Sequence, residues 1–196
     1  YAGWNKNDDY LRALGKGLHK GIEVMWTGDD VADMINQGDL DFFKTATGGM
    51  APFIWLNYPV NDYCIGHMLM GKFYGNDKGN NAFGGKMTAF TSNPMEYAEA
   101  SKVALYGVAD YAWNMKDYNP EANWERAIRY LMPNNAEAFH VFCEHNVDLG
   151  WTVHGLRREG ESPNFNVNGT LDEQKDQFDL MVEAADALLA DTYNPA

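Results

Sequence analysis

Two patterns of hydrophobic and polar residues divide the chain. Short runs rich in β-branched and aromatic residues predict three strands, at 21–27, from 53 to just before Pro59, and at 87–91. The segment between the first two strands, 30–45, has apolar residues at helical spacing and predicts a helix. Strands that alternate with helices or long loops predict parallel β/α units.

The strongest helix prediction covers 94–114, directly after the third strand. Asn93 is expected to cap this helix, Pro94 to occupy its first turn, and Glu96 and Glu99 to lie near the positive end of its dipole. Further along the chain the spacing predicts only helices, at 123–131, 135–147 and 170–189.

The predicted elements therefore form two parts: residues 1–115 are β/α, and residues 116–196 are almost entirely helical. Three strands cannot close a barrel, and a free edge of a parallel sheet invites association. The α/β fold is expected to be either a small open sheet with a helical extension or the C-terminal portion of a TIM (β/α)8 barrel, about three β/α units, followed by a helical region. A chain that opens directly at Tyr1 favours the barrel portion.

Charge and composition exclude several classes of partner. A net charge of −13 over 196 residues and a pI of about 4.6 argue against nucleic acid and against an anionic membrane surface. No apolar run approaches the ~18 residues of a membrane span. The start of the chain lacks the basic residues and apolar stretch of a signal peptide. The two cysteines, Cys64 and Cys143, are expected to be unpaired.

Polar side chains gather where the second strand is expected to end. Trp55 is followed by Asn57, Asn61 and Asp62, and Pro59 prevents the strand from continuing. In α/β folds the carboxyl ends of the strands carry the binding sites. An indole beside amides and a carboxylate suits a sugar, which is apolar on its faces and polyhydroxylated on its edges.

A series of short motifs extends this reading over nearly the whole chain, in order and at compatible spacing. They are Val24–Gly28, Trp55–Asp62, Tyr74–Asp77, Ser92–Glu96, Ala98-Glu99, Ser101-Lys102, Ala109–Asn114, Trp124–Ile128 and His145-Asn146. Together they resemble glycoside hydrolase family 84, the bacterial β-N-acetylglucosaminidases related to O-GlcNAcase and once called hyaluronidases. The resemblance implies that the three strands are the last three of a (β/α)8 barrel. It also implies that Tyr1–Tyr10 form the loop after the fifth strand.

The resemblance also implies a mechanism. In the family, the acetamido oxygen of the substrate attacks the anomeric carbon and forms an oxazoline, an exception to the usual retaining arrangement. Two adjacent aspartates after the fourth strand polarise the acetamido group and transfer the proton, and this chain is expected to begin after them. The pairs Asp8-Asp9 and Asp29-Asp30 lie outside that context and are expected to be loop or helix-cap residues. No catalytic residue is therefore expected here.

The resemblance implies that this chain supplies residues of the family's sugar pocket. By this resemblance Trp55 walls the acetamido pocket, Asn57 hydrogen-bonds in the same region, and Asp62 binds outer hydroxyls. Asn93 contacts sugar hydroxyls, a role that can coexist with helix capping because an amide has both donors and an acceptor. The remaining expected substrate-binding residues are Thr27, at the end of the first strand, and Tyr1, which matches a tyrosine that donates to the acetamido group.

No cofactor and no metal are expected. His140 and Glu144 share a helix face, but two ligands without a third make a weak metal site. The expected partners are glycans or glycoproteins that contain N-acetylglucosamine, together with the missing N-terminal barrel half or a self-association partner. The resemblance implies a secreted or periplasmic location. Two alternatives stay open: a non-catalytic sugar-binding module, and a cleavage product or incomplete sequence without a role of its own.

Overall fold

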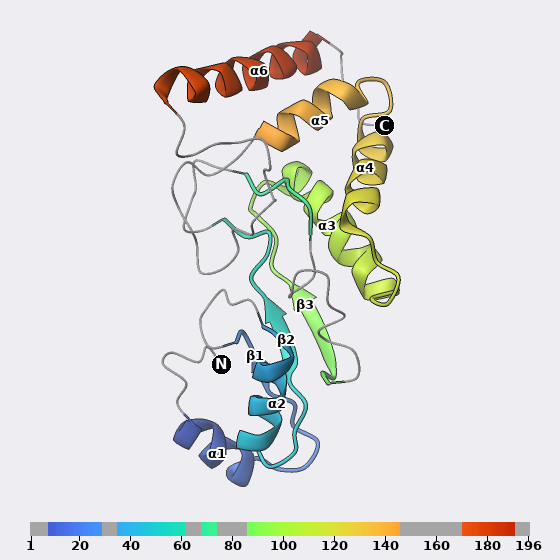
Figure 1. Ribbon diagram of the computed structural model, residues 1–196. Coiled ribbons are helices and arrows are strands. Elements are labelled where there is room, and N and C mark those ends of the chain that lie inside the picture. The colour runs from blue at the N-terminus through green and yellow to red at the C-terminus, as the bar shows by residue number, and fades with distance from the viewer. Residues whose placement is uncertain (1–7, 29–34, 62–67, 74–85, 146–169, 191–196) are drawn as a thin grey trace. The chain divides into compact units, whose positions relative to one another are not determined.

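A computed structural model describes residues 8–28, 35–61, 68–73, 86–145 and 170–190 of the chain (Figure 1). The described residues form two compact units, which are considered separately. The first contains the described residues up to Val60 and those from 86 to Pro94, and it holds the sheet. The second contains the described residues of Asn61–Phe73 and those from Met95 onward, and it is helical.

The sheet has three strands in the order β1-β2-β3, and they are parallel, as predicted (Figure 1). The strands are β1 (Met25–Trp26), β2 (Phe53–Leu56) and β3 (Ala89–Ser92). They pair in a single register, with Trp26 beside Ile54 and Ile54 beside Phe90. Parallel strands in register bring their carboxyl ends to one edge of the sheet.

The two faces of the sheet differ in burial. Ile54 and Leu56 are buried on one face, where Trp26 stacks against Phe43 of α2 (Gln37–Ala46) with ring centroids 4.9 Å apart. Trp55, on the alternate side of β2, is 36% exposed. Because successive residues of a strand point to opposite faces, α2 covers one face and Trp55 lies on the other.

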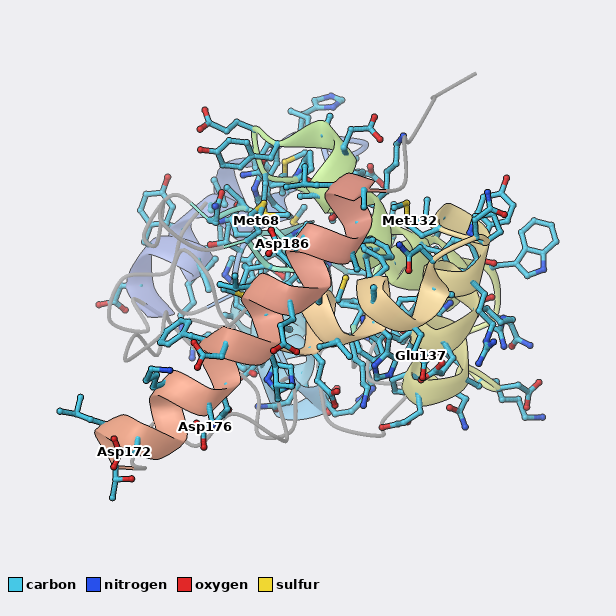
Figure 2. All side chains as sticks on the ribbon, turned by 90° about the horizontal axis from the view of Figure 1, so that it is seen from above. Met68, Met132, Glu137, Asp172, Asp176 and Asp186 are labelled. Atoms are coloured by element: carbon cyan, nitrogen blue, oxygen red, sulfur yellow. The ribbon has the colours of Figure 1, made fainter. Side chains whose placement is uncertain are left out.

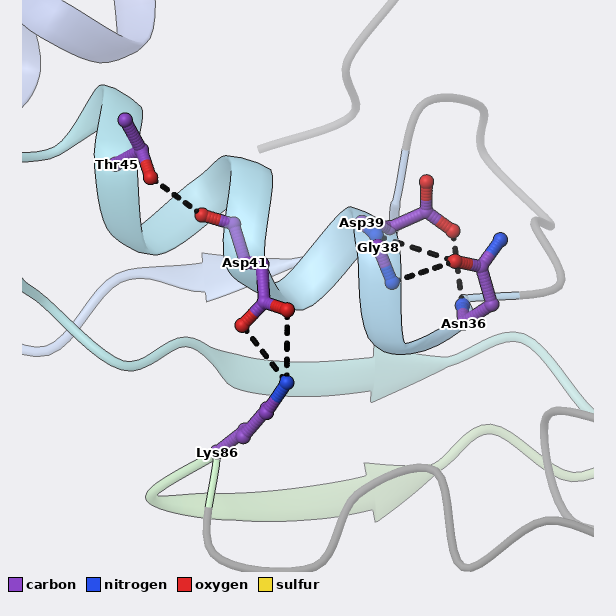
Figure 3. A network of polar contacts seen from close by, with 6 residues as sticks. All are labelled: Asn36, Gly38, Asp39, Asp41, Thr45 and Lys86. Carbon is purple, nitrogen blue, oxygen red and sulfur yellow. Dashed lines mark hydrogen bonds and ion pairs between the residues drawn. The ribbon is translucent and has the colours of Figure 1, made fainter.

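The helix predicted at 30–45 is confirmed from Gln37 onward, and residues 30–34 lie outside the described part of the chain. Asn36 caps α2: its side chain accepts from the backbone N–H of Asp39, whose carboxylate accepts from the N–H of Asn36 (Figure 3). This reciprocal capping box fixes where the helix begins. Lys86 joins the helix to the segment before β3 through Asp41, 2.8 Å from its Nζ (Figure 3).

The expectation of a loop through Tyr10 is wrong, because α1 (Asp8–Gly17) begins at Asp8. Asp8 and Asp9 are therefore the first two residues of a helix and do not lie in a polar loop. Tertiary packing stabilises α1: Leu11 is 2% exposed, and the backbone of Gly15 lies so close to Thr47 that a Cβ would come within 2.3 Å of its carbonyl oxygen. A short helix depends on such packing more than on propensity.

The second unit contains the remaining helices: α3 (Ala98–Trp113), α4 (Pro120–Leu131), α5 (Ala136–His145) and α6 (Leu171–Ala190). Its core consists of Met70, Val103, Trp124, Ile128 and Cys143, all at most 4% exposed. The indole N–H of Trp124 donates to the carbonyl of Met70 at 3.0 Å, so the largest core side chain is also satisfied.

The predicted start of α3 is wrong, because the helix begins at Ala98 and Asn93 does not cap it. The backbone of Asn93 continues the sheet: its N–H donates to Leu56 at 2.9 Å and its carbonyl accepts from Val60 at 2.9 Å. Pro94 also lies before the helix. The hydroxyl of Ser101 accepts from the N–H of Met95 at 3.1 Å, which ties the residues before the helix to its first turns.

The other helix predictions are confirmed with small changes at their ends. Helix α4 begins at Pro120 because the side chain of Asn119 accepts from Ala122, and not at 123 as the apolar spacing alone suggested. Helices α5 and α6 match the predicted segments, with residues 146–147 outside the described part. Among the described helices, none combines the length and apolar character that a membrane crossing requires.

Candidate functional site

Three of the predicted sugar-binding side chains meet at the carboxyl ends of β2 and β3. The indole Nε1–H of Trp55 donates to Oδ1 of Asn57 at 2.7 Å. The amide Nδ2–H of Asn93 donates to the same oxygen at 3.0 Å. Asn57 therefore fixes both the ring of Trp55 and the amide of Asn93. This Trp55–Asn57–Asn93 network is the candidate site.

The peptide backbone holds the network in place from both strands. The hydrogen bonds of Asn93 to Leu56 and Val60 extend the ladder one residue beyond β3. The hydroxyl of Ser92 donates to the carbonyl of Tyr58, next to the cis peptide bond between Tyr58 and Pro59. Ser92 is a positioning residue that the sequence did not single out, because a serine at the end of a strand carries no distinctive signal.

Of the other predicted site residues, Thr27 lies within the described part of the chain. Thr27 is half-buried and follows Trp26, the partner of Ile54, so it lies at the same sheet edge as Trp55. Asn61 is buried at 5% exposure. Asp62 and Tyr1 lie outside the described residues, as does the pair Asp29-Asp30.

The chemistry of the placed side chains is binding chemistry. An indole, two primary amides and a hydroxyl, from Trp55, Asn57, Asn93 and Thr27, offer an apolar face and hydrogen-bonding groups of both kinds. None of these groups gains or loses a proton near neutral pH, so none can act as a general acid or base. The placed residues can therefore orient a polyhydroxylated ligand but cannot protonate a leaving group.

His140 is part of a structural cluster in the second unit. Its Nε2 lies 2.9 Å from Glu125 of α4, its Nδ1 lies 3.6 Å from Glu144, and its ring packs edge-on against Trp124 with centroids 4.7 Å apart. Within the described residues, no group of three His, Cys, Asp or Glu side chains is arranged to hold a metal ion. His140 therefore links α4 to α5.

Cys143 does not have the environment of a nucleophile. The side chain is 1% exposed in the core of the second unit, and burial raises the pKa of its thiol well above the ordinary value. A thiol must ionise to become a strong nucleophile. Cys143 is therefore a core residue, free of any disulfide, as the sequence predicted for it.

Comparison with known proteins identifies the family. Residues 1–144 match the profile of the β-N-acetylglucosaminidase family. The chain therefore belongs to this family, glycoside hydrolase family 84. Its parallel sheet and helices are consistent with part of the barrel of such enzymes.

Individual relatives support the assignment. The chain is 29% identical over 102 residues to the protein O-GlcNAcase of Rattus norvegicus, a match that covers 52% of this chain and 11% of the rat protein. An O-GlcNAc hydrolase of Thermobaculum terrenum matches with a TM-score of 0.76 and 26% identity over 100% of this chain and 43% of that chain. The protein named CpGH84D matches with a TM-score of 0.74 and 30% identity over 96% of this chain and 33% of that one. The chain thus spans less than half the length of these relatives.

Proposed function

We propose that this chain is the sugar-binding part of a glycoside hydrolase that removes terminal β-linked N-acetylglucosamine. In this proposal residues 1–115 supply the last three β/α units of a (β/α)8 barrel, and residues 116–196 supply the helical extension. The pocket is lined by Trp55, Asn57, Asn93 and Thr27, with Asp62 and Tyr1 as further substrate-binding residues.

The observation that carries the proposal is the Trp55–Asn57–Asn93 network. Trp55 is 36% exposed, yet its indole N–H is fixed by Asn57. An aromatic face held in one orientation suits the apolar side of a pyranose ring or the methyl group of an acetamido substituent. The amide of Asn93, held by the same oxygen, suits ring hydroxyls. Charge-assisted bonds from Asp62 to two hydroxyls would add about 1.5–3 kcal/mol each.

The mechanism proposed for the whole enzyme is substrate-assisted. The acetamido oxygen of the sugar attacks the anomeric carbon, the bond to the leaving oxygen breaks, and an oxazoline forms that water later opens with retention. One carboxylate polarises the acetamido group and its neighbour donates the proton to the leaving oxygen. Because the placed side chains of this chain do not titrate near neutral pH, we assign both carboxylates to polypeptide outside it.

The substrates proposed are proteins or glycans that carry N-acetylglucosamine. The names of the relatives, O-GlcNAcase and O-GlcNAc hydrolase, support this class. A secreted or periplasmic location, and assembly with a missing barrel half, are further parts of the proposal.

Calorimetric titration with N-acetylglucosamine tests the binding proposal. We expect Trp55→Ala to weaken binding about tenfold or more, because the sugar loses its stacking surface. The matched control is Trp113→Ala, which removes a tryptophan that is 89% exposed on α3 and outside the network. Equal affinity in the Trp55→Ala variant and the unchanged protein would contradict the assignment.

Hydrolysis of an aryl β-N-acetylglucosaminide tests whether the catalytic carboxylates lie outside this chain. The 196-residue chain alone should show no turnover, and a longer polypeptide that includes the preceding barrel strands should be active. In that longer polypeptide Asp62→Ala should raise KM and lower kcat/KM. Turnover by the chain alone that Asp29→Asn abolishes would overturn the proposal. Sugar binding by a chain that stays inactive in every longer form would instead favour a binding module.

A further inference from the structure

The register of the sheet places a threonine beside Trp55 that the sequence patterns did not single out. Thr91 of β3 pairs with Trp55 of β2. Paired residues of adjacent strands point to the same face of a sheet, and the strands lie about 4.8 Å apart. The neighbouring pair, Ile54 with Phe90, points to the face that α2 covers, so Thr91 and Trp55 share the opposite face.

The Trp55–Asn57–Asn93 network lies on this same face. Asn57 stands two residues beyond Trp55. Asn93 stands two residues beyond Thr91, and residues two apart along a strand share a face. The side-chain hydrogen bonds to Asn57, from Trp55 at 2.7 Å and from Asn93 at 3.0 Å, agree with this alternation. Thr91 therefore has Trp55 beside it on the next strand and Asn93 after it on its own segment.

The hydroxyl of Thr91 differs from the neighbouring hydroxyls. Thr88 donates to the carbonyl of Pro52, and Ser92 donates to that of Tyr58. Thr91 is half-buried, and within the described part of the chain its hydroxyl has no such partner. A partly buried hydroxyl without a partner in the protein gains more from a polar ligand than one that is already bonded.

The surroundings of Thr91 at the strand ends are uncharged. The carboxylates that Figure 2 labels are exposed residues of the helical unit, on α5 and α6: Glu137, Asp172, Asp176 and Asp186. By contrast, the segments Trp55–Asn61 and Thr91–Met95 contain no charged residue. A hydrogen bond from Thr91 to a sugar therefore joins neutral groups, so its loss should change the affinity several-fold and not by the larger factor of a charge-assisted bond.

We propose that Thr91 is a further substrate-binding residue, whose hydroxyl hydrogen-bonds the acetamido group of the bound sugar. This inference rests on the proposed function, in which Trp55 walls the acetamido pocket. A substituent that lies against the indole ring comes within reach of the side chain beside that ring. An acetamido group offers both an N–H and a carbonyl oxygen, and a hydroxyl can pair with either.

Calorimetric titration of the 196-residue chain with N-acetylglucosamine tests the proposal. We expect Thr91→Val to weaken binding about three- to tenfold, because valine keeps the branched shape and the strand preference but lacks the hydroxyl. Thr91→Ser keeps the hydroxyl and should stay within about twofold of the unchanged protein. The matched control is Thr88→Val, the same substitution at an exposed threonine just before β3, which should leave the affinity unchanged.

The outcomes separate this inference from the proposed function. If Trp55→Ala weakens binding and Thr91→Val does not, the contact of Thr91 is wrong and the proposed function stands. If Thr91→Ser binds as weakly as Thr91→Val, the hydroxyl is not the cause of the loss, and the inference is again wrong. If the unchanged chain does not bind the sugar, both the inference and the proposed function are overturned.

Glucose as a second ligand tests which group of the sugar Thr91 contacts. Glucose carries a hydroxyl where N-acetylglucosamine carries the acetamido group. Thr91→Val should therefore lower the ratio of the affinity for N-acetylglucosamine to that for glucose about three- to tenfold, because only the acetamido sugar loses a bond. An unchanged ratio, with both affinities reduced, would overturn the assignment to the acetamido group.

Discussion

Removal of the shared acceptor in the candidate site gives the most direct test of the network. Asn57→Ala deletes the oxygen that accepts from Trp55 at 2.7 Å and from Asn93 at 3.0 Å. Each hydrogen bond contributes about 0.5–1.5 kcal/mol, so we expect the free energy of unfolding to fall by about 1–2 kcal/mol, the lower half of the sum because Trp55 is partly exposed. Urea unfolding followed by fluorescence measures this change.

Asn57→Asp is the matched control, because a carboxylate keeps an oxygen in the same position and accepts more strongly. This variant should remain within about 0.5 kcal/mol of the unchanged protein. In heteronuclear NMR the indole N–H signal of Trp55 should shift in Asn57→Ala and stay close to its original position in Asn57→Asp. The reasoning would be refuted if both variants lost the same stability, or if Asn57→Ala left the indole signal in place.

Three further predictions follow from packing. Gly15→Ala should destabilise the protein by about 1–3 kcal/mol, because its Cβ would meet the backbone of Thr47 at 2.3 Å. Gly17→Ala, on the same helix with nothing within 4 Å, should be neutral or slightly stabilising, and thermal unfolding separates the two. The thiol of Cys143 should resist alkylation in the folded chain and react after unfolding. Because burial raises the pKa of this thiol, only the unfolded state ionises above about pH 8.5, so stability should fall by up to about 1.4 kcal/mol per pH unit above that value. In Cys143→Ala this part of the pH dependence should vanish, and a persistent slope would show that another group causes it. Trp124→Phe should cost about 1–3 kcal/mol, since it leaves the carbonyl of Met70 buried without its donor; an unchanged urea midpoint would argue that the bond at 3.0 Å contributes nothing.

The ends of elements show where sequence patterns fail. The spacing of apolar residues identified α4, but its first residue depends on a cap, and Asn119 supplies that cap four residues before the predicted start at 123. The sequence Asn93-Pro94 has the form of a helix start. The prediction failed because the backbone N–H and C=O of Asn93 are both hydrogen-bonded to the segment that contains β2 and the residues after it. Local signals compete, and hydrogen bonds to a distant strand decide between them.

Helix α1 shows a different failure. Tyr10, Leu11 and Leu14 stand at helical spacing within Asp8–Gly17, but the expectation of a loop through Tyr10 passed over this signal. The helix is held by the close approach of Gly15 to Thr47, more than thirty positions away in the chain. A glycine that permits close backbone contact leaves no periodic signal.

The amino-acid sequence by itself determined the order of strands and helices, the family, and the presence of Trp55, Asn57 and Asn93 near strand ends. Periodicity and residue type are local properties, so each segment carries them before it meets any other. Only the tertiary structure decided that Asn57 and Asn93, 36 positions apart, share one hydrogen bond. That contact depends on the register between β2 and β3, which is set when the whole buried face of the sheet is packed at once.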